Sequence, residues 1–203
     1  MRTTEKRHHD PERAASRRKQ VLEAAALCFS RSGFHGASMA EISKAAGMSA
    51  GHIYNYFDGK DSIIMGFVER RMEEVSVLLR DLGQRDDPLQ AMLDDAPASL
   101  AEHLDPAFWT LPMEIHAEAS RNPRIAAALQ AADLDSRTQF RTLVKSAREK
   151  RGLAVDDVTM DGRVDTLISL FHGLPLRALH RPDMDRAALL DGFRVAMKAL
   201  LMT

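Results

Sequence analysis

The 203-residue chain is long enough to bury a hydrophobic core, and its composition favours helices, because aromatic residues make up only 5% and Pro and Gly are sparse. Its single cysteine, Cys28, excludes an intrachain disulfide, and its histidines lack the spacing of a metal site, so we expect no metal and no cofactor. No apolar run is long enough to span a membrane, and we expect a cytoplasmic protein with no membrane partner.

Charge is distributed unevenly along the chain. Residues 1–60 hold ten Lys or Arg against six Asp or Glu, whereas the remainder holds 18 against 23. A basic N-terminal part joined to an acidic remainder fits an anionic partner at one end, and it fits an ordinary solvated surface about as well.

Helical periodicity begins after a polar segment, residues 1–12, which we expect to be a flexible arm. Apolar residues at three- and four-residue spacings then predict a helix over residues 14–32, and Gly33 follows where a glycine commonly ends a helix. Ser38, with Glu41 three residues later, has the pattern of a capping box and predicts a second helix of about two turns.

A tight turn separates this second helix from a third one. Gly47 can adopt the positive φ that redirects the chain, and Ser49 can cap a short helix that carries Ile53 and Phe57 on its inner side. An apolar stripe over residues 60–82 then predicts a long fourth helix.

The remainder of the chain also has helical periodicity, interrupted at Asn122-Pro123, Gly152 and Arg181-Pro182. The expected helices cover residues 87–103, 106–119, 123–150, 157–180 and 184–202. No segment has the pattern of a strand, so the expected fold class is all-α.

Two short helices across a glycine turn, backed by a third helix, are typical of a DNA-binding helix-turn-helix motif. Ala50 and Gly51 are small enough for the helix backbone to approach the floor of a major groove. His52 and Asn55 carry hydrogen-bonding edges suited to bases, whereas nearby hydroxyls and a cation suit phosphates. The candidate DNA-contacting residues are Ser38, Ser49, Ala50, Gly51, His52, Tyr54, Asn55 and Lys60. The pattern of Arg17, Arg18 and Lys19 fits a phosphate contact and a solvated helix face about equally well.

This stretch resembles the TetR family of bacterial regulators. The residues that carry the resemblance are Phe29-x-x-x-Gly33-Phe34-x-x-x-Ser38-Met39-x-x-Ile42-x-x-x-Ala46-Gly47-Met48-Ser49-x-Gly51-x-Ile53-Tyr54-x-Tyr56-Phe57-x-x-Lys60-Asp61-x-Ile63. The departures are mild, with Ser38 where Thr is commoner, Ser43 where Ala is usual and Ile63 where Leu is usual. The body resembles the family in helix order and in the segment Gly173-Leu174-Pro175-Leu176-Arg177.

The resemblance implies about nine helices, an effector pocket in the body and a dimer built from the last two helices. We therefore expect a helix-turn-helix DNA-binding domain over residues 13–60 and a helical domain for effector binding and dimerisation over residues 61–203.

Two sets of body residues are candidates for these roles. Large apolar side chains mixed with a few polar atoms are typical of ligand pockets, although ordinary core packing is favoured for any single residue. The pocket candidates are Phe108, Trp109, Met113, His116, Phe140, Phe171 and His172. Wide apolar stripes on the last two helices predict a two-fold four-helix contact. Its candidate residues are Leu167, Phe171, Leu174, Leu190, Phe193, Met197 and Leu201.

A competing motif lies in the same stretch, because residues 47–51 spell the G-x-S-x-G of a serine hydrolase. That nucleophile needs a strand before the serine, and the preceding residues have a helical pattern instead. We therefore expect Ser49 to be a helix cap and the protein not to be an enzyme.

The sequence predicts a ligand-responsive transcription regulator that acts as a repressor. A dimer would place two copies of the third helix in successive major grooves of a palindromic double-stranded DNA operator, about 34 Å apart, and an unidentified small molecule would release it. The alternative is a DNA-binding architectural or cell-division partner on the same scaffold, without a small effector.

Overall fold

The computed structural model describes residues 11–203, and all regular secondary structure in that range is helical. The helices are α1 (Pro11–Gly36), α2 (Met39–Ala46), α3 (Ala50–Ile53), α4 (Lys60–Gly83), α5 (Pro88–His103), α6 (Pro106–Ala119), α7 (Pro123–Lys150), α8 (Asp157–His180) and α9 (Arg186–Met202). The all-α expectation is confirmed. None of the helices in the described range is long and apolar enough to cross a membrane.

Local signals set most helix starts, because the first backbone N–H groups of a helix lack partners within it. Side chains of Ser38, Ser49, Asp87, Asp105, Asn122, Asp156 and Asp185 accept hydrogen bonds from these N–H groups. Proline occupies the first turn of α5, α6 and α7, where its missing N–H costs nothing.

The first helix differs from the prediction at both ends. It begins at Pro11, so residues 11 and 12, expected in the arm, are helical, while the rest of the expected arm lies outside the described residues. At the other end Gly33 has φ 70° and ψ 169°, which interrupts the helix before a last turn that reaches Gly36. This combination of angles is almost confined to glycine, so Gly33 redirects the chain as predicted, but three residues before the helix ends.

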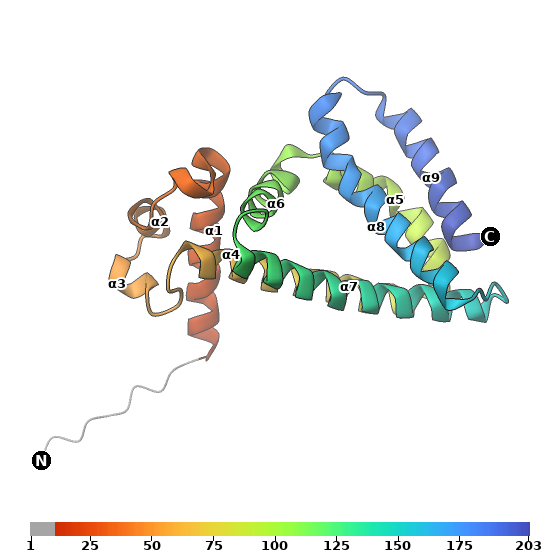
Figure 1. The fold of residues 1–203 in the computed structure, drawn as a ribbon, viewed down its shortest axis with the longest axis horizontal. Coiled ribbons are helices and arrows are strands. Elements are labelled where there is room, and N and C mark those ends of the chain that lie inside the picture. The colour runs from red at the N-terminus through yellow and green to blue at the C-terminus, as the bar shows by residue number, and fades with distance from the viewer. Residues whose placement is uncertain (1–10) are drawn as a thin grey trace, which may run out of the picture.

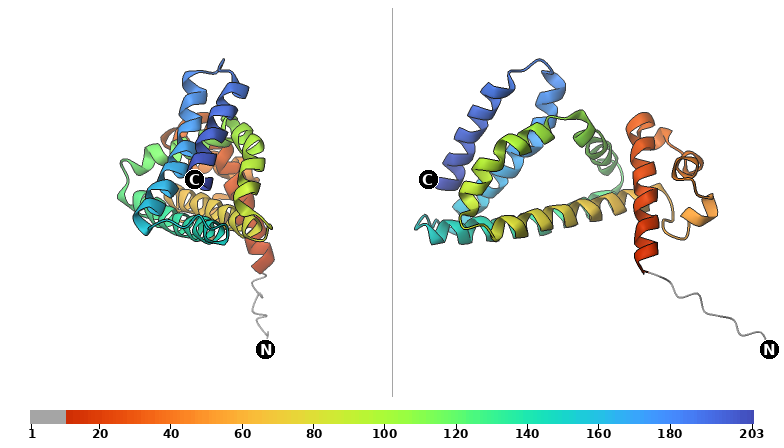
Figure 2. Two further views of the ribbon diagram at one scale, coloured as in Figure 1. Left: turned by 90° about the vertical axis from the view of Figure 1, so that its right-hand side faces the viewer. Right: turned by 180° about the vertical axis from the view of Figure 1, so that it is seen from behind.

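The helices form an elongated molecule with a distinct head (Figure 1). α1, α2 and α3 lie at one end, whereas α8, α9 and the C-terminus lie at the other. α4 and α7 run side by side between the two ends, and α6 packs against α1 (Figure 2).

Two groups of buried apolar residues hold this arrangement together. The first joins α1–α3 to the beginning of α4, including Ile63, Ile64 and Phe67, and also takes in Ile115 and Ile125 from α6 and α7. The core of the head therefore extends past Lys60 into the body. The second group joins the end of α4 to α5, α7, α8 and α9.

The candidate dimer residues lie in this second group and pack within the single chain. Leu167, Leu174, Phe193, Met197 and Leu201 are at most 6% exposed in the single chain, and Phe171 and Leu190 are half-buried against the same core. A stripe of apolar residues identifies a buried face but not the element that covers it. Here much of the cover comes from α5 of the same chain, which packs against both α8 and α9.

Candidate DNA interface and effector site

The turn between α2 and α3 is built by local hydrogen bonds. Ser38 Oγ accepts the Glu41 N–H at 3.2 Å, and Glu41 Oε2 accepts the Ser38 N–H at 2.8 Å, so the predicted capping box is present. The bond from the Ser38 backbone is the main cause of the lowered pKa of Glu41. Gly47 then adopts φ 62°, and Gln20 Nε2 donates to the carbonyl of Ala46 at 2.7 Å, which ties the end of α2 to α1. These bonds set the direction in which α3 leaves the turn.

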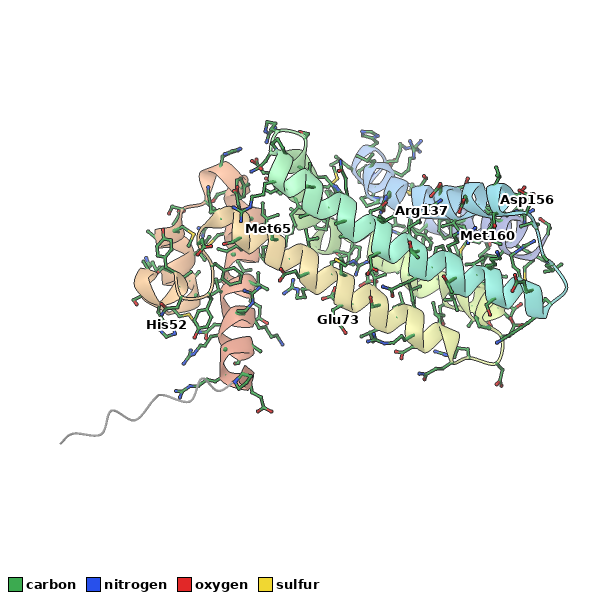
Figure 3. All side chains as sticks on the ribbon, turned by 60° about the horizontal axis from the view of Figure 1, so that its bottom comes forward. His52, Met65, Glu73, Arg137, Asp156 and Met160 are labelled. Carbon is green, nitrogen blue, oxygen red and sulfur yellow. The ribbon has the colours of Figure 1, made fainter. Side chains whose placement is uncertain are left out.

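The third helix is a single turn with one buried side and one open side. Ser49 Oγ accepts the His52 N–H at 3.3 Å, while Ile53 and Phe57 are at most 2% exposed and anchor the inner side. The remaining candidates on this segment are all exposed, namely Ala50, Gly51, His52, Tyr54 and Asn55. Figure 3 shows His52 at the end of the molecule that lies away from α8. An exposed short helix supported from behind can enter a DNA groove.

The basic residues at the start of α1 have different surroundings. Arg17 lines a hollow on the head surface together with Gly47, Met48, Ser49 and His52. Its guanidinium donates to Gln20 on its own helix, 2.8 Å away, and remains beside the exposed α3 residues.

The side chain of Arg18, in contrast, contacts other residues of the fold. It donates to the carbonyl of Tyr56 at 3.2 Å, pairs with Glu69 at 3.0 Å and stacks 4.5 Å from the centre of the Phe57 ring. Lys19 pairs with Glu23 one turn away on the exposed side of α1. The structure therefore separates three residues that the sequence left equivalent.

Lys60 was expected to hold a phosphate, but its side chain has a structural partner. Its Nζ donates to the carbonyls of Phe34 and Ala37 at 2.6 and 2.8 Å, with His35 O at 3.5 Å, and it lies 4.6 Å from the centre of the Phe34 ring. An ammonium group has three donors, and three carbonyls surround it. Its position therefore links the start of α4 to the end of α1.

Two aromatic pocket candidates meet at a histidine that the sequence analysis missed. His103 lies 4.8 Å from Phe108 and 5.2 Å from Phe171, measured between ring centres, and the Arg71 guanidinium stacks on Phe108. His103 Nδ1 donates to the carbonyl of Ser99 at 2.8 Å. Burial is the main cause that lowers the pKa of His103; the bond to Ser99 opposes the lowering and the charge of Arg71 adds to it. His103 is therefore a neutral donor at neutral pH.

The other pocket candidates are dispersed. Phe140 packs against the second core, Met113 is half-buried, and His116 and His172 are exposed, with rings 6.4 Å apart. The partial burial that remains at its ring, together with the neighbouring His172, lowers the pKa of His116.

Trp109, a predicted pocket residue, lines a cavity in the body. Its partners there were all missed: Leu104, Pro106, Ala178, Arg181, Pro182, Met184 and Arg186. The sequence marked Arg181-Pro182 as a helix break, but no local pattern shows that this loop folds onto the start of α6.

The hydrolase interpretation lacks its structural requirement, because helix α2 precedes Ser49 and the described chain contains no strand. The Ser49 hydroxyl caps α3 instead. Within residues 11–203 no group of three His, Cys, Asp or Glu side chains is placed to hold a metal ion.

An exposed short helix after a capped helix and a glycine turn, joined to a larger helical body, defines the class of helix-turn-helix DNA-binding regulators. Comparison with known proteins identifies the family. The model of "Bacterial regulatory proteins, tetR family" matches residues 21–65, and that of "BetI-type transcriptional repressor, C-terminal" matches residues 85–201. The chain belongs to the TetR family of transcriptional regulators.

Individual relatives agree with this assignment along almost the whole chain. The regulator UidR of Escherichia coli is 28% identical over 190 residues, covering 91% of this chain and 92% of UidR. CymR of Pseudomonas putida is 27% identical over 188 residues, covering 89% and 88%. Among solved structures, GusR of Salmonella enterica has a TM-score of 0.71 at 25% identity, covering 93% of this chain and 96% of GusR. FadR of Bacillus subtilis, solved with stearoyl-CoA, has a TM-score of 0.69 at 14% identity, covering 91% and 97%.

Proposed function

We propose that this chain acts in the cytoplasm as a homodimer that represses transcription from a palindromic operator until a small-molecule effector binds in its body. The observation that carries the proposal is the exposed side of α3, anchored from behind by the buried Ile53 and Phe57. The match to a C-terminal domain described as that of a transcriptional repressor supports repression, and the relative solved with stearoyl-CoA supports a ligand in the body.

In this proposal α3 enters the major groove, and each exposed residue has a role. Ala50 and Gly51 allow close approach, His52 and Asn55 read base edges, and Tyr54 contacts a phosphate. Ser38 and Ser49 present helix N-termini to the two sides of the groove, and Arg17 adds a cation next to α3. Lys60 contributes by holding α4 against α1.

Dimerisation uses the side of α8 and α9 that points away from the protomer core. Exposed residues that are small or apolar follow this side in both helices, and small residues let helices approach closely. They include Thr166, Ser169, Leu176, Leu179, Ala188, Gly192, Val195 and Ala199. Leu176, Leu179 and Val195 are 44%, 54% and 71% exposed, which supports a partner on this face.

Helix α6 provides a physical connection between body and head. Glu114 Oε2 accepts the N–H of Phe34 at 3.1 Å, and the buried Glu118 pairs with His35 at 2.9 Å. The carboxylates of α6 therefore hold the end of α1, whereas Trp109 lies near the other end of α6 in the body. A ligand that prefers a shifted α6 would move the heads and change their spacing, through a coupling of roughly 1–3 kcal/mol.

The test starts from the operator, found by mapping bound DNA across the source genome. Asn55→Ala is expected to weaken operator binding by about 1–3 kcal/mol relative to random DNA, because one base contact is lost. Equal weakening on both DNAs would contradict a base-reading role for Asn55. Bound sites without any change in transcription after deletion of the gene would contradict repression and favour an architectural role.

A further inference from the structure

A cavity of about 80 Å³ lies where the loop between α8 and α9 meets the start of α6. Residues from five segments surround it: Leu104 after α5, Pro106 and Trp109 from α6, Ala178 from α8, the loop residues Arg181, Pro182 and Met184, and Arg186 from α9. The walls are formed mainly by apolar side chains, and Leu104 is only 2% exposed. Such a cavity suits the apolar body of a small molecule.

The tryptophan of this cavity has an unpaired polar atom. Trp109 Nε1 is buried and has no hydrogen-bond acceptor within the described residues. An indole N–H can only donate, and buried donors normally have a partner. A ligand that fits beside Trp109 is therefore expected to carry an acceptor.

Two arginines line the same cavity. Arg186 forms no hydrogen bond or ion pair with any residue of the described chain. Among the described residues, the Arg181 side chain pairs only with Asp183, at 3.6 Å, and both side chains are mostly exposed, so this pair is weak. Two further carboxylates adjoin the lining residues, and both cap helices. Asp185 accepts the N–H groups of Ala187 and Ala188 at 2.9 and 3.1 Å at the start of α9, and Asp105 accepts the N–H of Ala107 at 2.9 Å at the start of α6.

We propose that this cavity binds a small amphiphilic anion, namely a carboxylate or phosphate attached to an aromatic or short aliphatic body. The apolar body packs against Trp109, Leu104 and Met184, and the anion pairs with Arg186 and Arg181. Planar guanidinium groups suit both anions, because each presents parallel N–H donors to two oxygens. The indole N–H of Trp109 donates to an oxygen of the ligand.

Binding of the anion does not depend on the proposed function. The further inference that the bound anion acts as the effector does rest on that function. Trp109 belongs to the same helix as Glu114 and Glu118, the residues that hold the end of α1. An anion that draws the α8–α9 loop toward α6 therefore acts on the helix that contacts the head.

The binding test uses the full chain and four probes of similar shape. Benzoate and phenyl phosphate carry the anion, benzamide is neutral and benzylamine is a cation. Binding is measured by calorimetry and by the fluorescence of Trp109, which is the only tryptophan in the chain. At least one of the two anions is expected to bind, about tenfold or more tightly than benzamide, and benzylamine is expected not to bind.

Matched variants test whether the arginines are responsible. Arg186→Gln is expected to weaken binding of the anion about tenfold, whereas Arg85→Gln, which removes the same charge at an exposed site after α4, should leave it unchanged. Trp109→Phe keeps an aromatic surface but removes the donor, and calorimetry should show weaker binding. The proposal is overturned if benzoate and phenyl phosphate both fail to bind, if benzamide binds equally well, or if Arg186→Gln binds as the wild type does.

A separate measurement distinguishes this inference from the proposed function. The bound anion is added to the protein–operator complex, and release of DNA supports the effector role. Arginine-dependent binding without release would support the anion site and contradict its role as the effector site. Operator binding by a protein that binds neither anion would overturn the site alone.

Discussion

Arg17 and Arg18 are neighbours in sequence whose side chains have different surroundings in the head. Arg17 lies beside Ser49 and His52, whereas Arg18 is bound to Tyr56 and Glu69 and stacks on Phe57. At the residue scale, the tertiary structure thus distinguishes a cation beside the exposed α3 residues from one bound within the fold.

We predict that Arg17→Ala weakens binding to operator and to random DNA alike and lowers the slope of log affinity against log salt by about one contact. Arg18→Ala should instead lower the stability of the fold, because the Phe57 ring loses its cover. DNA titrations at several salt concentrations, together with urea unfolding of both variants, check this. A similar loss of salt slope in both variants would contradict the distinction.

We expect His103 to make the stability of the body depend on pH. Its pKa is lowered in the folded chain, so the unfolded chain binds more protons as the pH falls through the ordinary histidine range. The stabilisation is therefore present above that range and is lost as the pH falls toward the pKa of the folded state.

We predict that the urea midpoint falls between about pH 7.5 and about pH 5.5, and that His103→Asn reduces this fall. The fall should not vanish, because the pKa of His116 is also lowered. An unchanged pH dependence in the variant would show that His103 does not contribute to it.

At the scale of elements, most helix ends follow from local signals. The end of α1 also depends on a close contact between Gly33 and α6. Gly33 has φ 70°, and a Cβ atom built on it would lie 3.3 Å from Glu114 Oε2 of α6. Gly36, three residues later, lacks a positive φ, and a Cβ there would meet only Ser32 of the same helix at 3.4 Å.

We predict that Gly33→Ala destabilises the protein by about 1–3 kcal/mol, because its backbone angles are unfavourable for any side chain and Glu114 has to move. Gly36→Ala should change the free energy of unfolding by less than about 0.5 kcal/mol. Equilibrium denaturation of the two variants measures this difference directly, and equal effects would refute the explanation.

At the scale of the whole molecule, the exposed side of α8 and α9 is the surface where we expect two protomers to meet. Val195 on α9 and Leu27 on α1 are both 71% exposed, and their helices lie at opposite ends of the molecule. Leu27 is therefore a suitable control for a substitution at Val195.

We predict that the wild type sediments as a dimer and that Val195→Glu shifts it toward the monomer, because a charge buried in the contact would lack a partner. Leu27→Glu should remain dimeric. Loss of the dimer should also weaken operator binding strongly, since the two heads then no longer bind as a linked pair. A Val195→Glu variant that remains dimeric would place the contact elsewhere.

The helix positions, the capping box and the glycine turn of the head could all be predicted from the sequence, because these features depend on residues a few positions apart. The same local reasoning separated the buried Ile53 and Phe57 from the exposed residues of α3. The resemblance to the TetR family could likewise be recognised from a single stretch of 35 residues, from Phe29 to Ile63.

Other properties were decided only by the tertiary structure, since they depend on contacts between residues far apart in the chain. Lys60 binds the end of α1, the apolar stripes of α8 and α9 face their own protomer, and Arg181 and Arg186 meet Trp109 across more than 70 positions of sequence. Periodicity shows that a helix has an apolar side, but the partner of that side is chosen by how all the helices pack together.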